Sequence, residues 1–200
     1  MAPLRTRARV FILVVSLFLD SIHASLPPTN RTIDDTYGDS VTGSLPSYSG
    51  SWNIGQDCSS CDAQPSAADA FRGSWHDATT QTNPNDGAPS TVTLSFQGTA
   101  IWVYCILVEI ASTEYASYFG SNISFELDGT LEGTFIHVLD NPWSAVIPLR
   151  QDLGDQNGGY SYNQTVFSKT GLQNQDHTLV ITPVRGANAS LLLFDWAEYT

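Results

Sequence analysis

The sequence predicts an all-β fold, an antiparallel jelly-roll β-sandwich with little helix. Short apolar runs, each long enough for one strand, recur along the C-terminal half and alternate with polar segments rich in turn residues. No long run combines the 3.6-residue apolar period of a helix with capping residues at its ends. Runs spaced in this way are typical of sandwiches and jelly rolls, in which function lies in the loops. We therefore expect one β-sandwich domain over residues 51–200, which is enough chain to bury a core.

The N-terminus has the three parts of a secretory signal peptide. Arginines at positions 5, 7 and 9 precede an apolar run over residues 10–19, and Ala24 ends a small-residue cleavage site. The apolar run is too short to span a bilayer, and no second long run follows it. We therefore expect residues 1–24 to be removed, the mature chain to be secreted, and the protein to have no transmembrane segment.

The mature chain is expected to begin with irregular segments. Residues 25–50 are rich in Pro, Ser, Thr and Gly, and we expect an extended N-terminal segment containing one strand. Residues 51–70 are interpreted as an irregular loop held by Trp52 and two cysteines, and residues 70–77 as a short strand or turn. An exposed loop over residues 79–89 precedes the regular part of the fold.

Alternation of apolar and polar residues begins at Thr91. Val92, Leu94 and Phe96 fall on one face of an expected strand, and the polar residues between them fall on the other. A turn then leads into a central strand over residues 99–108. Further strands are expected at residues 122–127, 134–139, 160–167, 177–183 and 190–199.

The composition is strongly acidic. Twenty Asp and Glu residues against eight Lys and Arg give a formal net charge of −12, and the expected signal peptide would remove three of the basic residues. Such a surface repels phosphate backbones and anionic lipid, so we expect neither nucleic acid nor a membrane surface as a partner. It suits neutral polysaccharides, divalent cations or solubility alone.

Four Asn-X-Ser/Thr sequons agree with secretion, and we expect N-glycosylation at them. They are Asn30, Asn122, Asn163 and Asn188. A glycan marks a solvent-exposed face and excludes that face from a tight partner interface.

The compartment decides how the three cysteines are interpreted. Cys58 and Cys61 have thioredoxin or zinc spacing, but no βαβ pattern surrounds them and no second Cys/His pair completes a zinc site. In an oxidising compartment we expect a local Cys58–Cys61 disulfide, which fixes a turn more than it adds stability. Cys105 lies in an apolar run, where we expect a buried free thiol. A longer bridge from Cys58 or Cys61 to Cys105 is the alternative.

Short motifs follow one another through the mature chain. They are residues 34–39 (DDTYGD), Trp52, Cys58 with Cys61, 71–77 (FRGSWHD), 96–105 (FQGTAIWVYC), 125–129 (FELDG), 177–181 (HTLVI) and 193–199 (LFDWAEY). In this order they resemble a group of secreted or membrane-anchored proteins of mushroom-forming fungi. The resemblance covers nearly the whole mature chain. It implies a galactose-binding-like jelly roll, similar to those of carbohydrate-binding modules, and it implies the fold more firmly than an activity.

His76 and Asp77, with Ser74 close by, come nearest to a catalytic set. A Ser-His-Asp triad needs its members brought together by the fold, and no Gly-x-Ser-x-Gly elbow is present. The alternative is structural, with Asp77 capping backbone amides in a turn and His76 at a strand end. The histidines also lack the i, i+4 spacing of zinc or iron ligands. We therefore name no catalytic residue.

Calcium is the cofactor that we consider for this chain. Asp34, Asp35 and Asp39 crowd one segment. Jelly-roll modules of the resembled type often hold a structural Ca²⁺ where the first and last strands meet. The resemblance therefore implies that Asp195 joins Asp34 or Asp35 as an oxygen ligand. The alternative is that these aspartates form Asx turns in an exposed segment.

Aromatic residues beside polar loops are the candidates for carbohydrate binding. A flat ring covers the apolar face of a sugar while polar neighbours bond to its hydroxyls. The candidates are Trp143, Asp152, Asp155, Asn157, Tyr160 and Tyr162. Trp102, Tyr104 and Trp196 lie within expected strands and are assigned to the core.

The leading hypothesis is a secreted, non-catalytic module that binds glycans or cell-wall surfaces through its loop aromatics. A secreted hydrolase or lyase with a loop-walled acidic cleft is one alternative. A purely structural cell-surface interaction protein is the other.

Overall fold

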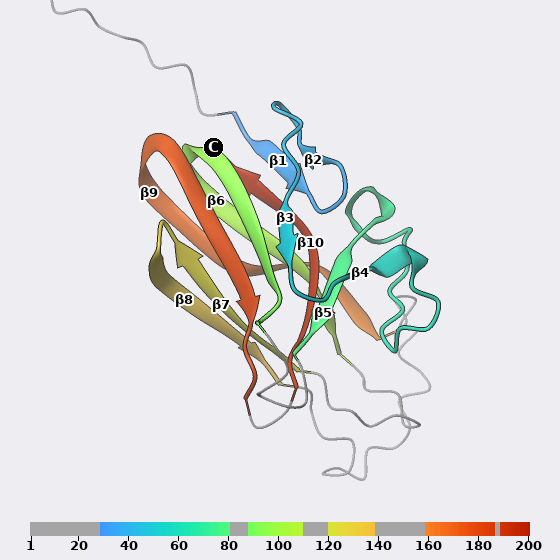
Figure 1. The fold of residues 1–200 in the computed structure, drawn as a ribbon. Coiled ribbons are helices and arrows are strands. Elements are labelled where there is room, and N and C mark those ends of the chain that lie inside the picture. Colours follow the sequence, from blue (N-terminus) through green and yellow to red (C-terminus); the bar gives the residue numbers. More distant parts are fainter. Residues whose placement is uncertain (1–28, 81–87, 110–119, 139–158, 187–188) are drawn as a thin grey trace, which may run out of the picture.

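The computed structural model describes residues 29–80, 88–109, 120–138, 159–186 and 189–200. Within these ranges the chain forms ten strands and two short 3-10 helices, without an α-helix (Figure 1). The strands are β1 (Arg31–Asp34), β2 (Gly38–Asp39), β3 (Ser47–Ser49), β4 (Asn53–Ile54), β5 (His76–Thr79), β6 (Thr91–Val108), β7 (Ser121–Leu127), β8 (Thr130–His137), β9 (Tyr160–Pro183) and β10 (Leu191–Tyr199). The 3-10 helices are η1 (Gly55–Asp57) and η2 (Phe71–Gly73). No helix in the described part of the chain is long and apolar enough to cross a membrane.

Two long strands, β6 and β9, run side by side and are shared by two layers. The first half of β6 pairs with the second half of β9, beginning with Val92 opposite Ile181. The register shifts after Gly98, and the second half of β6 pairs with the first half of β9 as far as Val108 opposite Tyr160. Figure 1 shows both strands bending sharply, so that each contributes to both layers of the sandwich.

The remaining strands extend these two layers, and all of the strand pairs are antiparallel. In the first layer β3 pairs with the start of β6, β7 pairs with the end of β9, and β8 pairs with β7. In the second layer β10 pairs with the end of β6, β1 with β10, and β2 with β1. β5 adds to the start of β10, and β4 adds to β5. The predicted antiparallel jelly-roll sandwich is therefore confirmed.

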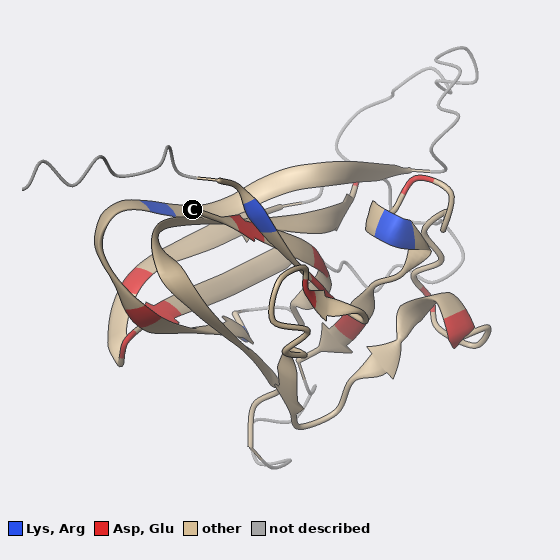
Figure 2. Cartoon of the chain, turned by 90° about the horizontal axis from the view of Figure 1, so that it is seen from above, with Lys and Arg blue, Asp and Glu red and all other residues tan. Residues whose placement is uncertain are grey.

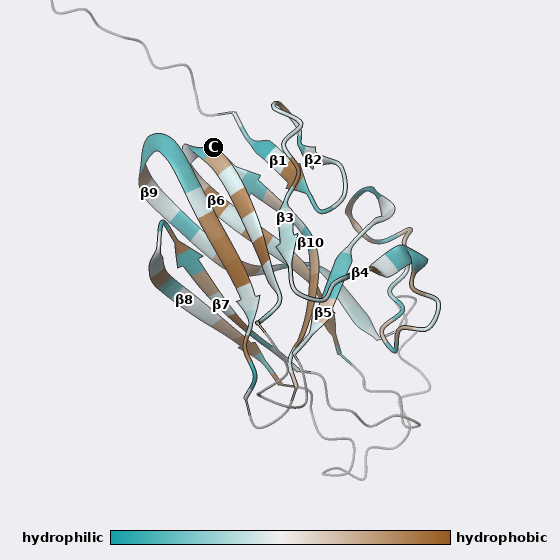
Figure 3. Ribbon diagram, in the orientation of Figure 1, coloured by the Kyte–Doolittle hydropathy of each residue, from teal (hydrophilic) through white to brown (hydrophobic). Residues whose placement is uncertain are grey.

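The main core lies between the layers. Val92, Leu94 and Phe96 are buried in it, which confirms the face that the sequence predicts for this strand. They share the core with Phe125 of β7 and Phe194 of β10. Figure 3 shows apolar and polar segments alternating along β6, as expected for a strand with one buried face.

A smaller apolar cluster lies on the opposite face of β10. Its buried members are Ala63, Ala70, Trp75, Ile106, Leu191 and Leu193. Leu192 and Phe194 belong to the main core, so successive residues of β10 enter the two clusters in turn. Because both faces of β10 are buried here, residues 191–194 are all apolar and do not alternate with polar residues. The loop over residues 58–70 contributes Ala63 and Ala70 to this smaller cluster, which we call the outer apolar cluster. The loop therefore packs against the second layer.

The cysteines form the predicted local disulfide and leave Cys105 free, without the alternative bridge to Cys105. Cys58 and Cys61 form a disulfide with their Cα atoms 5.4 Å apart. Cys105 is a buried free cysteine in the main core. Burial raises the pKa of its thiol well above the ordinary value, so the thiol stays protonated and inert.

Two expectations about position differ from the structure. The described part of the 25–50 segment contains three strands, β1, β2 and β3, where one is expected, and all three pair within the sandwich. Trp102, Tyr104 and Trp196 are half-buried on an outer face and are not in the core. They occupy the alternate positions of strands whose other residues fill the core, and period-two geometry sends such positions outward.

Candidate functional site

A polar pocket of about 210 Å³ lies between the disulfide loop and the strands β4, β5 and β10. Strand pairing builds its floor, since Asn53 of β4 lies opposite Asp77 of β5, and Thr79 of β5 lies opposite Leu191 of β10. The loop supplies the facing wall. The described lining residues are Asn53, Ser60, Cys61, Asp62, Ala63, Asp77, Thr79 and Leu191.

Asp77 is the distinctive residue of this pocket. Its side chain is buried, with the residue only 3 % exposed. Its Oδ2 accepts a hydrogen bond of 2.9 Å from the Nδ2 of Asn53, while its Oδ1 has no hydrogen-bond partner among the described residues. Burial raises the pKa of Asp77, against the lowering effects of Asn53 and of the charge on His76. An unpartnered buried carboxylate oxygen costs stability unless a water molecule, an ion or a ligand supplies the missing interaction.

The wall of the pocket is held in place by several bonds. Besides the disulfide, the Nε2 of Gln64 donates to the carbonyl oxygens of Cys58 and Cys61, at 2.6 and 2.7 Å. The hydroxyl of Tyr160 accepts a bond of 2.7 Å from the backbone N–H of Gln64. The hydroxyl of Tyr162 accepts one of 2.7 Å from a backbone N–H two residues further on. The loop is therefore fixed both internally and to β9.

The structure thus gives Tyr160 and Tyr162 a definite position. The sequence suggests them as rings of a binding rim, whereas both are partly buried against the outer apolar cluster with their hydroxyls bonded to the loop. They hold the wall that carries Cys61 and Asp62. The other predicted sugar-binding residues, Trp143, Asp152, Asp155 and Asn157, lie outside the described residues.

The predicted glycosylation sites fall on different parts of the surface. Asn30 and Asn163 are exposed, Asn122 is half-buried, and Asn188 lies outside the described residues. The Oδ1 of Asn163 accepts a bond of 3.0 Å from the indole of Trp196, and the Nδ2 of Asn30 donates one of 2.7 Å to Glu198.

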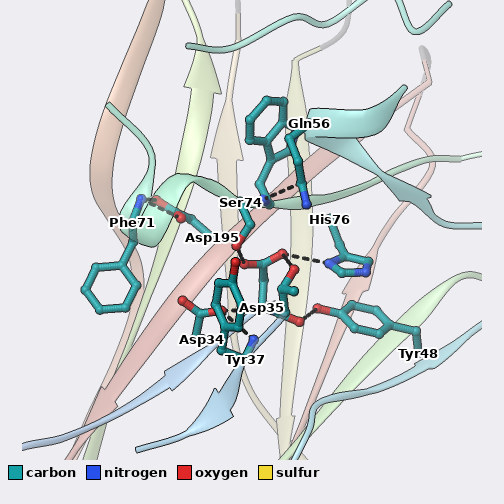
Figure 4. A network of polar contacts seen from close by, with 11 residues as sticks. Asp34, Asp35, Tyr37, Tyr48, Gln56, Phe71, Ser74, His76 and Asp195 are labelled. Atoms are coloured by element: carbon teal, nitrogen blue, oxygen red, sulfur yellow. Dashed lines mark hydrogen bonds and ion pairs between the residues drawn. The ribbon is translucent and has the colours of Figure 1, made fainter. Parts of the chain in front are cut away.

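A second polar cluster lies where β1 and β10 meet η2 and β5 (Figure 4). Asp34, Asp35 and Asp195 are each no more than 1 % exposed. They come together because β1 pairs with β10 and the backbone N–H of Asp35 donates to the carbonyl oxygen of Asp195, at 3.1 Å. The first and last described strands therefore do bring these three aspartates into one cluster.

The electrostatics of this cluster are those of crowded buried acids. Burial, together with the charges of Asp35 and Asp34, raises the pKa of Asp195 to about 7, against a hydrogen bond from Phe71 that lowers it. Burial also raises the pKa of Asp34, against hydrogen bonds from the backbone of Tyr37 and Thr36. Removal from water therefore outweighs the local donors in both side chains.

These aspartates accept hydrogen bonds from the surrounding protein. Asp34 accepts from two backbone N–H groups, Asp35 bonds with Ser74 and His76, and Asp195 accepts from the backbone N–H of Phe71. Protein donors occupy the oxygens of Asp35 and Asp195 and the Oδ1 of Asp34, whereas the Oδ2 of Asp34 is buried without a hydrogen-bond partner among the described residues and lies 3.9 Å from the Nε of Arg72. Among the described residues no group of three or more His, Cys, Asp or Glu side chains is placed to hold a metal ion.

The same cluster contains Ser74 and His76, but not in the order of a catalytic triad. The hydroxyl of Ser74 donates to one oxygen of Asp35 at 2.6 Å, and the Nδ1 of His76 lies 2.7 Å from the other oxygen. The carboxylate therefore stands between serine and histidine, whereas a triad needs the histidine between them to take the hydroxyl proton. Ser74 is also buried, and the ring of His76 stacks on Tyr48 with centroids 4.2 Å apart.

An aromatic stack covers part of the outer face near η2. Trp196 lies between Phe71 and Tyr104, with ring centroids 4.4 and 4.2 Å apart and interplanar angles of 15° and 9°. Both faces of the indole are therefore occupied by protein rings. Because a sugar stacks on a free ring face, Trp196 offers no platform for one.

Sequence reasoning missed most of this pocket. Asn53, Ser60, Asp62 and Thr79 lie in short strands and turns with no periodic pattern, and only the fold joins them to Leu191. One pattern could have drawn attention to Asp77, because a carboxylate in an otherwise strand-like stretch must find partners or a ligand.

Comparisons with known proteins return structures but no sequence relatives. No family model matches the chain, and no curated protein matches it. A family 35 carbohydrate-binding module from Clostridium thermocellum is similar, with 4% identity, 86% of this chain and 99% of that chain covered, and a TM-score of 0.47.

Two further solved structures match with lower TM-scores. The CBM36-1 domain of a multidomain xylanase from the hindgut metagenome of Trinervitermes trinervoides has 10% identity, with 60% of this chain and 83% of that chain covered and a TM-score of 0.32. The catalytic domain of a GH87 alpha-1,3-glucanase has 15% identity, with 86% of this chain and 27% of that chain covered and a TM-score of 0.40. The fold assignment rests on the strand pairing described above.

Proposed function

We propose that this protein is a secreted, non-catalytic module that binds a glycan through the pocket beside Asp77. The observation that carries the proposal is a buried carboxylate with one unpartnered oxygen in a pocket of polar side chains. A sugar hydroxyl would donate the missing hydrogen bond. The expected signal peptide and the disulfide support an oxidising, extracellular setting.

The lining of the pocket has the two kinds of surface that a sugar needs. Asp62, Asp77 and the side-chain amide of Asn53 offer bonding partners for hydroxyl groups, and Ser60 and Thr79 add hydroxyls of their own. Leu191, Ala63 and the disulfide provide apolar contact for ring carbons. The volume of about 210 Å³ lies below the usual range of pockets for drug-sized ligands, so we expect one sugar ring or a chain end.

The enzyme alternative has less support. Ser74 and His76 are separated by Asp35, and Ser74 is buried, so the described residues offer no serine nucleophile with a histidine base. Asp77 and His76 are neighbours on β5 and fall on opposite faces of that strand, with the histidine ring directed to Asp35. Binding without catalysis therefore accounts for the geometry more simply.

Calorimetric titration of the secreted protein with oligosaccharides of plant and fungal polysaccharides tests this function. We expect binding of at least one oligosaccharide, and we expect Asp77→Asn to weaken it at least about tenfold, because a charge-assisted hydrogen bond is lost. The matched control is Asp176→Asn, which removes an exposed acid from β9.

Thermal unfolding checks that both variants are folded. Asparagine keeps the shape of Asp77 and an acceptor for Asn53, so we expect no loss of stability from this substitution. If no oligosaccharide binds, or if Asp77→Asn binds as the unchanged protein does, the proposed function of the pocket is wrong.

A further inference from the structure

We propose that the sugar unit held in this pocket carries a protonated amine, as a glucosamine residue does. This inference rests on the proposed function and specifies its ligand. It follows from the charge of the pocket, from the state of Asp77, and from the number of acceptors that the lining presents.

The first observation is the charge. Asp62 and Asp77 both line the pocket, and none of its described lining residues is Lys, Arg or His. Few of the described residues are Lys or Arg, as the colouring of Figure 2 shows, and the side chains of two of them are engaged elsewhere. Lys169 bonds to Glu132 at 2.5 Å, and the guanidinium of Arg72 lies over the ring of Tyr37 at 4.3 Å.

The adjacent histidine does not neutralise the pocket either. Because successive side chains of a strand point to opposite faces, His76 points away from the face that carries Asp77. Its Nδ1 lies 2.7 Å from a carboxylate oxygen of Asp35 (Figure 4). Burial raises the pKa of Asp77, and the charge of His76 opposes this by lowering it, which favours the ionised, negative form of that carboxyl. A negative pocket of this kind repels uronic acids and sulfated sugars.

The second observation is the unpartnered oxygen of Asp77. Its Oδ1 is buried and without a hydrogen-bond partner among the described residues, while Asn53 satisfies the Oδ2. A neutral hydroxyl would supply a hydrogen bond but leave the buried charge uncompensated. An ammonium group supplies the bond and the opposite charge together, and such charge-assisted bonds are about twice as strong as neutral ones.

The third observation is the imbalance of donors and acceptors. Ionised carboxylates only accept hydrogen bonds, and the Nδ2 of Asn53 already donates to Asp77. The lining around Asp62 and Asp77 is therefore rich in acceptors. An ammonium group brings three donors and no acceptor, so it matches this lining better than a hydroxyl does.

A matched pair of ligands tests the inference. The glucosamine tetramer and the N-acetylglucosamine tetramer share one backbone and differ in whether the nitrogen is charged, and a glucose tetramer serves as the neutral reference. Titrations are run on the secreted protein at about pH 6, where an amine of this type is protonated, and in about 0.15 M salt, which screens charges on the open surface.

We expect the glucosamine tetramer to bind at least about tenfold more tightly than either neutral tetramer. Asp77→Asn and Asp62→Asn should each reduce this preference, the buried Asp77 more strongly, whereas Asp176→Asn should leave it unchanged. Tighter binding of a neutral tetramer, lost in Asp77→Asn, would overturn the amino-sugar inference and leave the proposed function standing.

Two other outcomes also count against the inference. An equal loss of binding in Asp176→Asn and Asp77→Asn would trace the preference to the acidic surface as a whole. Binding of no tetramer at all would reject the inference together with the proposed function.

Discussion

Asp195 shows how a single buried acid makes the stability of this protein depend on pH. Its carboxyl is inaccessible to solvent, and its pKa is raised to about 7 by burial first and then by Asp35 and Asp34. In the unfolded chain an aspartate loses its proton near pH 4. Between about pH 4 and about pH 7 the folded state therefore binds a proton that the unfolded state lacks.

The free energy of unfolding is accordingly expected to fall as the pH rises from about 4 to about 7, at a rate on the order of 1 kcal/mol per pH unit from this group. Asp195→Asn, which is neutral throughout, should remove that fall. The free energy of unfolding should therefore decrease less between pH 5 and pH 7 in the variant than in the unchanged protein. Denaturant unfolding at a series of pH values measures the difference between the two proteins.

Other titratable groups also make the free energy of unfolding depend on pH in this experiment. His177 has a raised pKa, despite burial, because Asp128 and Gln173 bond to its ring, and its contribution also declines as the pH rises. The lowered pKa of Asp39 has the opposite effect on the free energy of unfolding: its contribution is present above the ordinary pKa of an aspartate and is lost as the pH falls below that value. The decisive quantity is therefore the difference between variant and unchanged protein, and equal slopes would show that Asp195 titrates normally.

At the scale of elements, the position of the short helix η1 depends on a close contact between the backbone of Gly55 and the indole ring of Trp75. An ideal Cβ built on Gly55 would lie 1.9 Å from the Nε1 of Trp75, so only glycine lets the backbone sit against the indole. The backbone N–H of Gly55 also donates to the carbonyl oxygen of Trp75, at 2.8 Å. This contact aligns the chain before the disulfide with β5, and hence one wall of the pocket with its floor.

Gly55→Ala is expected to destabilise the protein by about 2–4 kcal/mol, because the buried ring of Trp75 must shift in a packed cluster. Tryptophan fluorescence during chemical unfolding gives the free energy and reports on the ring environment. Gly186→Ala is the control, since its added Cβ would have its nearest neighbour at 3.7 Å. A similar small effect in both variants would contradict the close approach.

Elements also differ in how far their sequence predicts them. The alternation from Val92 to Phe96 fixes a strand face because side chains of a strand have period two. The buried run of β10 is also visible, but not that Leu191 and Leu192 enter different clusters, because this depends on the loop that covers the second layer. The pocket could not be predicted, since Asn53 and Asp77 meet only through the pairing of strands with two and four residues.

At the scale of the whole molecule, the sequence makes a prediction about compartment. In a eukaryotic secretory host we expect the protein in the medium with Ser25 as its first residue, because the apolar run over residues 10–19 directs export. Digestion with an N-glycosidase should lower its apparent mass, because exposed asparagines such as Asn30 and Asn163 lie in sequons.

N-terminal sequencing and gel mobility measure both effects. Val14→Asp interrupts the apolar run and should retain the protein in the cell, whereas Thr6→Ala leaves the run intact and should not. Secreted material that still begins at Met1, or whose mobility is unchanged by the glycosidase, would contradict the respective part of the prediction.

The sharing of β6 and β9 by both layers has a consequence for how the chain reaches its native state. Val92 must find Ile181 and Val108 must find Tyr160, so the central pairing joins segments that are far apart in sequence. Closing such long loops costs entropy before any contact rewards it, and folding dominated by distant pairings is slow. Because neither layer is complete without these two strands, we expect the layers to form in a single cooperative step, and slow amide exchange should be concentrated along β6 and β9.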